Sequence, residues 1–251
     1  MSEQIYIKRL NNLKNKLSGM GVDGILLTNL TSIRYLSGFT GSAASCLITT
    51  DGSYFISDGR YDVQSKEQVK GLDRFIDFGT HISIIDKNNL IPNGLTLGFE
   101  SDHTSVSQFK AMQDTFSNVN WESTSMLMEN LQAVKDQSEL DAIRTAVEIT
   151  DAIYEEIIPM LKVGTTEKEV AIQLVTRYRQ ESDGEAYSPI VAGGPNSALP
   201  HAVPGNRPFE KGDFIVIDAA AKIAGYHADM TRTPVVGEAS GKHREIYNIV
   251  K

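Results

Sequence analysis

The chain has 251 residues, of which 41% are hydrophobic and 22% are charged, a balance that predicts a globular protein with a real core and excludes a disordered chain. Its formal net charge of −8 argues against a nucleic-acid or anionic-membrane surface, because binding phosphate groups requires clustered Lys and Arg. Cys46 is the only cysteine, which excludes an internal disulfide, and the sequence has neither a signal-peptide pattern nor a membrane-spanning apolar run, so a cytoplasmic protein is expected.

The first half of the chain alternates helix and strand patterns. Leu10, Leu13 and Leu17 recur at helical spacing before Gly21, and residues 24–28 form a short apolar strand pattern. Further strand patterns cover residues 75–78, 95–99 and 119–123, and a helix pattern covers residues 106–116. This alternation predicts an α/β domain with a mixed sheet.

A β-hairpin is predicted around Asp51-Gly52. The dipeptide lies between strand patterns at residues 44–50 and 53–57, and it suits a two-residue turn in which both central residues have positive φ. Cys46 lies in the apolar part of the first of these strands. Its position predicts a small buried core residue, with a thiolate nucleophile as the alternative.

The domain boundary is predicted after residue 128, which gives an N-terminal domain of residues 1–128 and a second domain of residues 129–251. Strand patterns stop near this point, and a long helix pattern begins in the charged segment 135–140. Gly164 ends that helix. Thr166 and Glu169 form a capping box for another helix, which runs to about Glu181.

Two aspartates, Asp218 and Asp229, flank a predicted hairpin turn. If Ile223 and Ala224 form a two-residue loop, the two aspartates are direct cross-strand partners with Cβ atoms roughly 4.5–5.5 Å apart. Like charges placed so close repel, whereas a divalent cation favours a pair of anionic oxygen ligands. The alternative is two plain surface carboxylates, or an ion pair with Arg232, although alternation places Arg232 on the opposite face.

Three further residues are candidates for the same site. His201 lies between prolines that stiffen its backbone, which suits a histidine that transfers protons or polarises a carbonyl; a turn histidine with a local hydrogen bond is the alternative. His227 and Thr231 share a strand face with Asp229. His227 is more typical of a surface residue than of a metal ligand, and Thr231 suits a hydrogen bond to a carboxylate.

Several motifs together resemble the creatinase and aminopeptidase P branch of the pita-bread metallopeptidases, the Xaa-Pro peptidase family. The most specific is the run from Asp218 through Asp229-Met230-Thr231-Arg232-Thr233. Weaker similarities lie at residues 33–42, 57–61, 134–144, 188–201 and 209–213. The resemblance therefore runs along essentially the whole chain.

The resemblance implies an α/β creatinase-like N-terminal domain followed by an α+β pita-bread catalytic domain. It also implies hydrolysis of a peptide bond preceding proline, as an aminopeptidase or a dipeptidase, with Asp218 and Asp229 as metal ligands and His201 in contact with the substrate. Two divalent ions, with manganese favoured over cobalt or zinc, a proline-containing peptide substrate and a homodimer are implied as well.

The sequence also departs from the family pattern. The family needs a further His and two Glu ligands after the second aspartate, and Glu238, His243 and Glu245 do not stand in the matching contexts. The chain ends inside a helix pattern, so the catalytic domain is expected to be C-terminally incomplete, carrying only part of the metal site. A non-catalytic peptide-binding or protein-binding module of the same ancestry is the main alternative. A metal-free hydrolase of the creatinase kind ranks last, because both aspartates are present.

Overall fold

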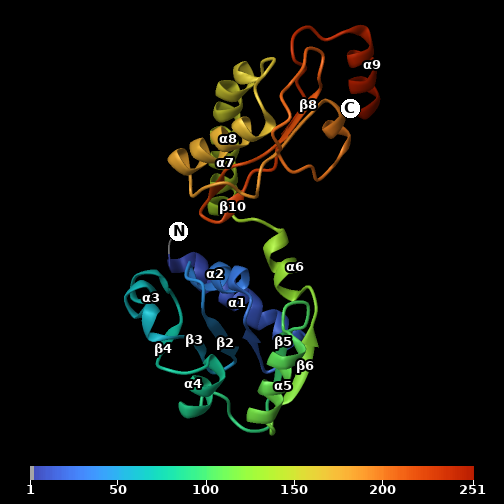
Figure 1. Cartoon of the computed structure of the whole chain (residues 1–251). Coiled ribbons are helices and arrows are strands. Elements are labelled where there is room, and N and C mark those ends of the chain that lie inside the picture. The colour runs from blue at the N-terminus through green and yellow to red at the C-terminus, as the bar shows by residue number, and fades with distance from the viewer. Residues whose placement is uncertain (1–2) are drawn as a thin grey trace. The chain divides into compact units, whose positions relative to one another are not determined.

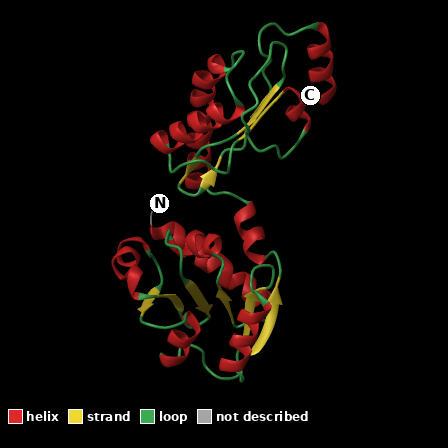
Figure 2. Ribbon diagram, viewed as in Figure 1, coloured by secondary structure: helices red, strands yellow, loops and turns green. Residues whose placement is uncertain are grey.

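A computed structural model describes residues 3–251. The chain divides into two compact units, Met1–Val134 and Lys135–Lys251. Each unit has its own sheet and its own covering helices (Figures 1 and 2).

The first unit is built on a six-stranded mixed sheet. Strand β1 (Gly24–Leu27) pairs antiparallel with β2 (Ser45–Thr49) and parallel with β5 (Thr96–Glu100). The remaining strands are β3 (Ser53–Ser57), β4 (Asp73–Ile76) and β6 (Asn120–Thr124), and the order across the sheet is β4-β3-β2-β1-β5-β6. The predicted α/β domain with a mixed sheet is therefore confirmed.

Helices cover both faces of this sheet. They are α1 (Glu3–Gly19), α2 (Leu30–Ser37), α3 (Asp62–Gln68), α4 (His81–Lys87), α5 (Val106–Thr115) and α6 (Leu127–Ala133), with a short 3-10 turn, η1 (Gly59–Tyr61). Ile25 and Leu27 pack into a core with α1, α2 and α6, whereas Leu26 packs on the other face with α4 and α5. Strand alternation thus divides one apolar run between two layers.

The hairpin between β2 and β3 forms with a different turn from the predicted one. Thr49 N donates to Gly52 O at 2.8 Å, so Thr50 and Asp51 are the central residues, and neither Asp51 nor Gly52 is among the described residues with positive φ. A Cβ atom on Gly52 would lie 2.1 Å from the Tyr54 hydroxyl oxygen. Glycine here lets a ring lie close to the backbone, and its freedom to adopt positive φ is not used.

Cys46 is a core residue, as expected. Its side chain has no exposed surface, and burial raises the pKa of the thiol far above its ordinary value. A thiol held in this protonated form is a poor nucleophile, so the nucleophile alternative is wrong.

The second unit packs two long helices against a small antiparallel sheet. The helices are α7 (Gln137–Ile157) and α8 (Glu167–Glu181), followed by β7 (Ile190–Gly193), β8 (Ile215–Asp218), β9 (Lys222–Ile223), β10 (Tyr226–His227), β11 (Thr231–Arg232) and α9 (Gly241–Val250), with 3-10 turns η2 (Ile158–Met160) and η3 (Gly194–Ala198). The larger sheet has the order β11-β8-β7. The predicted capping box of Thr166 and Glu169 is present at the start of α8.

The buried side of this sheet supplies the core of the second unit. Ile215 and Ile217 of β8 pack with Ile153 of α7 and Leu174 of α8. The intervening residues of β8 point to the other face, which leaves Asp218 on the side away from the helices. Across residues 3–251, the helices are too short or too polar to pass through a bilayer.

Candidate metal centre

Asp218 and Asp229 lie on one face of the β8–β11 hairpin, as diagonal neighbours and not as direct partners. Asp218 pairs with Thr231, and Tyr226 pairs with Ile223. The two-residue turn is therefore Ala224-Gly225, with φ of 50° and 81°. The predicted Ile223-Ala224 turn and the direct pairing that depended on it are wrong, because a tight hairpin turn needs positive φ at both positions and glycine supplies it most easily.

The hydroxyl group of Tyr187 connects the two carboxylates. It donates a hydrogen bond to Asp218 Oδ1 and lies 3.2 Å from Asp229 Oδ1. Burial and the two carboxylates raise the pKa of Tyr187 well above its ordinary value, so the phenol keeps its proton. Since a phenol has a single proton, it can satisfy only one carboxylate at a time, and the second negative charge is left without a donor from this group.

Tyr187 is not identified as a site residue from the sequence, although a sequence pattern points to its position. Ile190 pairs with Asp218 across β7 and β8, so residues just before β7 must approach the end of β8 that carries the aspartate. A strand pattern at residues 190–193 with an aromatic residue just before it could have placed Tyr187 there.

Tyr154 supports the hairpin from its buried side. Its hydroxyl donates to Met230 O at 2.8 Å and also lies 3.1 Å from Ile217 O and 3.3 Å from Ala219 O. These three carbonyl groups belong to the residues that flank Asp218 and Asp229. Burial raises the pKa of Tyr154, which keeps it a neutral donor.

The remaining alternatives for the aspartates are decided by their neighbours. Arg232 forms an ion pair with Asp151 of α7, 3.3 Å away, so it does not serve as the counter-charge for Asp229.

The two aspartates differ in exposure, since Asp218 is half-buried and Asp229 is exposed. Two carboxylates held on one face by a shared donor have the oxygen chemistry that divalent ions prefer. In residues 3–251, however, no group of three or more His, Cys, Asp and Glu side chains is arranged so that it could hold a metal ion. The residues described therefore fit one side of a metal site.

The histidine candidates do not join this pair in the described contacts. His201 is exposed in the loop after η3, and His227 is exposed opposite Lys222. Burial and the nearby Lys222 lower the pKa of His227. Thr231 lies opposite Asp218 on the same face.

Two downstream residues left without a ligand role in the sequence have local partners. His243 Nδ1 accepts a hydrogen bond from Ser240 N at 3.0 Å within a capping box, and its ring meets Phe214 edge-on. Glu245 pairs with Lys242 at 3.1 Å. Both contacts are what an ordinary surface helix makes.

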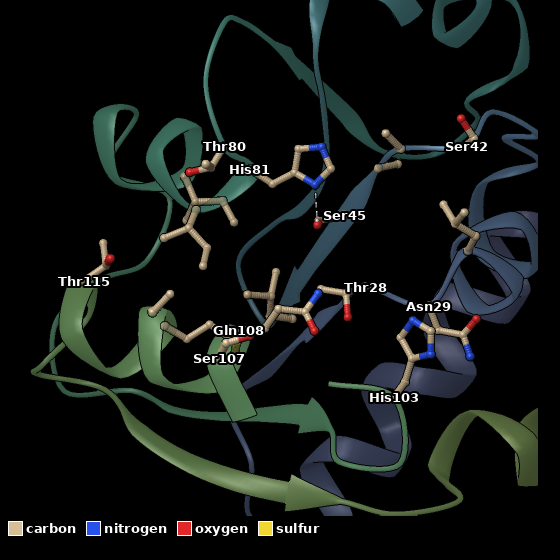
Figure 3. A pocket seen from close by; sticks show the side chains of 18 residues that line it. Thr28, Asn29, Ser42, Ser45, Thr80, His81, His103, Ser107, Gln108 and Thr115 are labelled. Carbon is tan, nitrogen blue, oxygen red and sulfur yellow. Dashed lines mark hydrogen bonds between the residues drawn. The ribbon is translucent and has the colours of Figure 1, made fainter. Parts of the chain in front are cut away.

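The first unit contains a separate cavity of about 640 Å³ (Figure 3). Ser45 Oγ and His81 Nδ1 lie 2.8 Å apart in its wall, which is also lined by Thr28, His103 and Gln108. Within the set of lining residues, none is Asp or Glu. The cavity therefore lacks the carboxylates of a metal centre, and the Asp218–Asp229 pair is the better candidate.

His81 is expected to make the stability of the first unit pH-dependent. Burial lowers the pKa of its imidazole below 6.5, and Asp58 opposes this only in part. As pH falls below about 6.5, the unfolded chain takes up a proton that the folded chain resists, so stability should decline between pH 6.5 and 5. Urea unfolding followed by the fluorescence of Trp121, the only tryptophan, measures this. His81→Gln should flatten the decline and His103→Gln, at an exposed position, should not; equal profiles for all three proteins would contradict the assignment.

The chain matches two described families. The creatinase/prolidase N-terminal domain matches residues 9–134, and metallopeptidase family M24 matches residues 141–251. An uncharacterized peptidase of Bacillus subtilis is 34% identical, over 96% of this chain and 69% of the relative. The Xaa-Pro dipeptidase of Pyrococcus furiosus is 30% identical, over 97% of this chain and 69% of the relative.

Solved structures agree with this match. The Xaa-Pro dipeptidase from Bacillus anthracis superimposes with a TM-score of 0.91 at 36% identity, over 98% of this chain and 69% of that one. An X-Pro aminopeptidase from Thermotoga maritima superimposes with a TM-score of 0.85 at 32% identity, over 96% and 68%. These neighbours confirm the predicted fold class, and the chain spans 69% and 68% of their lengths.

Proposed function

Because the chain belongs to metallopeptidase family M24, with a creatinase/prolidase N-terminal domain preceding it, we propose that it serves the metal-dependent hydrolysis of a peptide bond preceding proline. The chain is similar to proteins named Xaa-Pro dipeptidase and X-Pro aminopeptidase. The observation that supports the proposal most directly is the pair Asp218 and Asp229, which share the hydroxyl of Tyr187 on one strand face. Both names specify a bond next to proline, but they differ in the length of the peptide that is cleaved. The proposal therefore specifies the bond and leaves the peptide length open.

Asp218 and Asp229 are proposed as the ligands that this chain contributes to a pair of divalent ions. The family implies divalent metal, and we propose manganese first, with cobalt and zinc as alternatives, since carboxylate oxygens suit hard cations. Such ions supply Lewis acidity, which polarises a peptide carbonyl and lowers the pKa of water. Tyr187 can hold the carboxylates in position by donating to whichever oxygen faces it.

His201 is proposed as the substrate-side residue. Its imidazole is exposed on a loop that begins after Gly193 of β7, opposite Ile215 of β8, the strand that carries Asp218. A histidine in contact with the peptide carbonyl would donate a hydrogen bond to the oxygen as negative charge develops there. A homodimer is proposed for the assembly, as the resemblance implies.

The proposal predicts manganese-dependent cleavage of a Xaa-Pro peptide by the purified chain. Two carboxylates give a low ligand charge, so binding on the order of millimolar manganese is expected. The assay compares Ala-Pro, Ala-Pro-Gly and the control Ala-Ala after dialysis against chelator, with manganese, cobalt or zinc restored. Cleavage of a proline peptide, but not of Ala-Ala, supports the proposal. No cleavage with any of the three metals would sink it for this chain.

A further inference from the structure

Glu167, the first residue of α8, carries a carboxylate that is almost fully buried, with 1% of its surface exposed. Its Oε1 accepts hydrogen bonds from Gly193 N at 2.8 Å and from Asn196 Nδ2 at 2.9 Å. Its Oε2 accepts from Gly205 N at 2.9 Å. A buried carboxylate is costly unless donors surround it, and here three donors do so.

These donors stand at the two ends of one loop. Residues 194–205, called here the His201 loop, leave β7 after Gly193 and return to α8 at Gly205. The return is reinforced by the backbone, since Lys168 N donates to Gly205 O at 3.0 Å. One side chain therefore closes a twelve-residue segment at both ends, with His201 between them.

Gly193, the residue just before the His201 loop, has little room to shift. A Cβ atom on Gly193 would lie 2.7 Å from the Phe209 ring, and Phe209 is itself buried. Gly193 also pairs with Ile215 in the ladder between β7 and β8. The beginning of the loop is thus fixed by the sheet and by packing, whereas its end at Gly205 depends on α8.

We propose that Glu167 is the positioning residue for His201. By holding Gly193, Asn196 and Gly205 on one carboxylate, it fixes the path of the loop and so the place of the imidazole relative to β8, which carries Asp218. The inference rests on the proposed function, because it gives the loop a catalytic purpose. Glu167 acts through the loop and does not itself contact metal or substrate.

The variant Glu167→Gln distinguishes the hydrogen bonds at one end of the loop from those at the other. An amide has one accepting oxygen and one donating NH₂ group, so the NH₂ group must face either Gly205 N–H or the two donors from Gly193 and Asn196. One hydrogen bond is lost if the NH₂ group faces Gly205, and two are lost if it faces Gly193 and Asn196. The arrangement with the NH₂ group facing Gly205 is therefore expected. Amide exchange of the whole chain should then be about tenfold faster at Gly205 and unchanged at Gly193.

The imidazole of His201 gives the readout that a merely structural role would not move. Its carbon-bound proton signals should shift and sharpen in Glu167→Gln as the loop gains freedom, while manganese affinity at the aspartate pair stays as in the wild type. If the chain cleaves Ala-Pro, kcat should fall by about tenfold with the manganese requirement unchanged. If it does not, the proposed function fails, and the exchange and His201 signals still decide the positioning role.

Glu169→Gln is the matched control, because it makes the same change two residues further along the same helix. Glu169 is exposed and belongs to the capping box with Thr166, a role that glutamine also fills. It should leave Gly205 and His201 unchanged. The proposal is overturned if Gly205 exchange does not rise in Glu167→Gln, if Glu169→Gln has the same effect, or if Gly205 is freed while the His201 signals stay in place.

Discussion

Replacing Asp218 with asparagine is expected to abolish manganese binding while leaving the metal-free fold intact. A unit charge about 4 Å from an ion contributes roughly 4 kcal/mol at an effective dielectric constant of 20, which corresponds to a loss of affinity of at least about a hundredfold. Asp229→Asn should act in the same direction but less strongly, because Asp229 is exposed and water screens its charge. Titration calorimetry with manganese measures both.

The same substitution should have the opposite effect on the metal-free chain. Asp218 and Asp229 repel each other, and the single proton of Tyr187 relieves only one of them at a time. The introduced asparagine keeps an acceptor for that hydroxyl and removes the repulsion, so Asp218→Asn should raise the free energy of unfolding by about 0.5 kcal/mol. Opposite signs for stability and metal affinity are typical of a functional site and not of a structural contact.

Asp151→Asn is the control for this pair. Asp151 is an exposed carboxylate of the same unit, and its partner is Arg232 on the hairpin. Its loss should leave manganese affinity unchanged. The assignment fails if Asp218→Asn still binds manganese with the wild-type affinity, or if Asp151→Asn weakens binding to the same degree.

The sequence predicts the strand face of the metal pair better than its register. The period of two along a strand places Asp229 and Thr231 on one side, and the predicted register, which is wrong by two residues, still places Asp218 on that side. Register depends on which two residues form the turn, and here that choice lies between Ile223-Ala224 and Ala224-Gly225. A hydrogen bond from Ala224 N to Asp183 Oδ2, 2.7 Å long, supports the observed turn, and a partner 41 residues away is beyond local pattern analysis.

The same distinction explains which parts of the fold were predictable. Helices α1 and α8 follow from local signals, the leucine spacing and the Thr166–Glu169 capping box. The turn between β2 and β3 does not, because its central residues are Thr50 and Asp51, one position before the Asp51-Gly52 dipeptide, and the Tyr54 ring lies close to Gly52. Tyr187 and Glu167 act through contacts between segments 26 to 42 residues apart, so neither role can be read from spacing along the chain.

Tyr154→Phe is expected to weaken both the fold of the second unit and its metal site. The hydroxyl is the buried donor to Met230 O, and without it that carbonyl keeps only the longer bond, 3.3 Å, from Ala219 N. Losing one hydrogen bond of this kind costs about 0.5–1.5 kcal/mol, and the phenylalanine ring has no donor to replace the contact. Chemical unfolding of the purified variant measures this loss.

Tyr154→Phe should also lower the affinity for manganese, because of where the three carbonyl groups near the Tyr154 hydroxyl lie. Ile217 and Ala219 precede and follow Asp218, and Met230 follows Asp229, so one hydroxyl ties together the two strand segments that carry the carboxylates. Losing a partner that orients metal ligands typically lowers affinity by about tenfold. Tyr247→Phe, at an exposed site on α9, should change stability by less than about 0.5 kcal/mol and leave manganese affinity unchanged. If Tyr154→Phe lowers stability but keeps the wild-type manganese affinity, then Tyr154 supports only the core and not the metal site. In that case the strand ladder and Tyr187 set the spacing of Asp218 and Asp229 without help from α7.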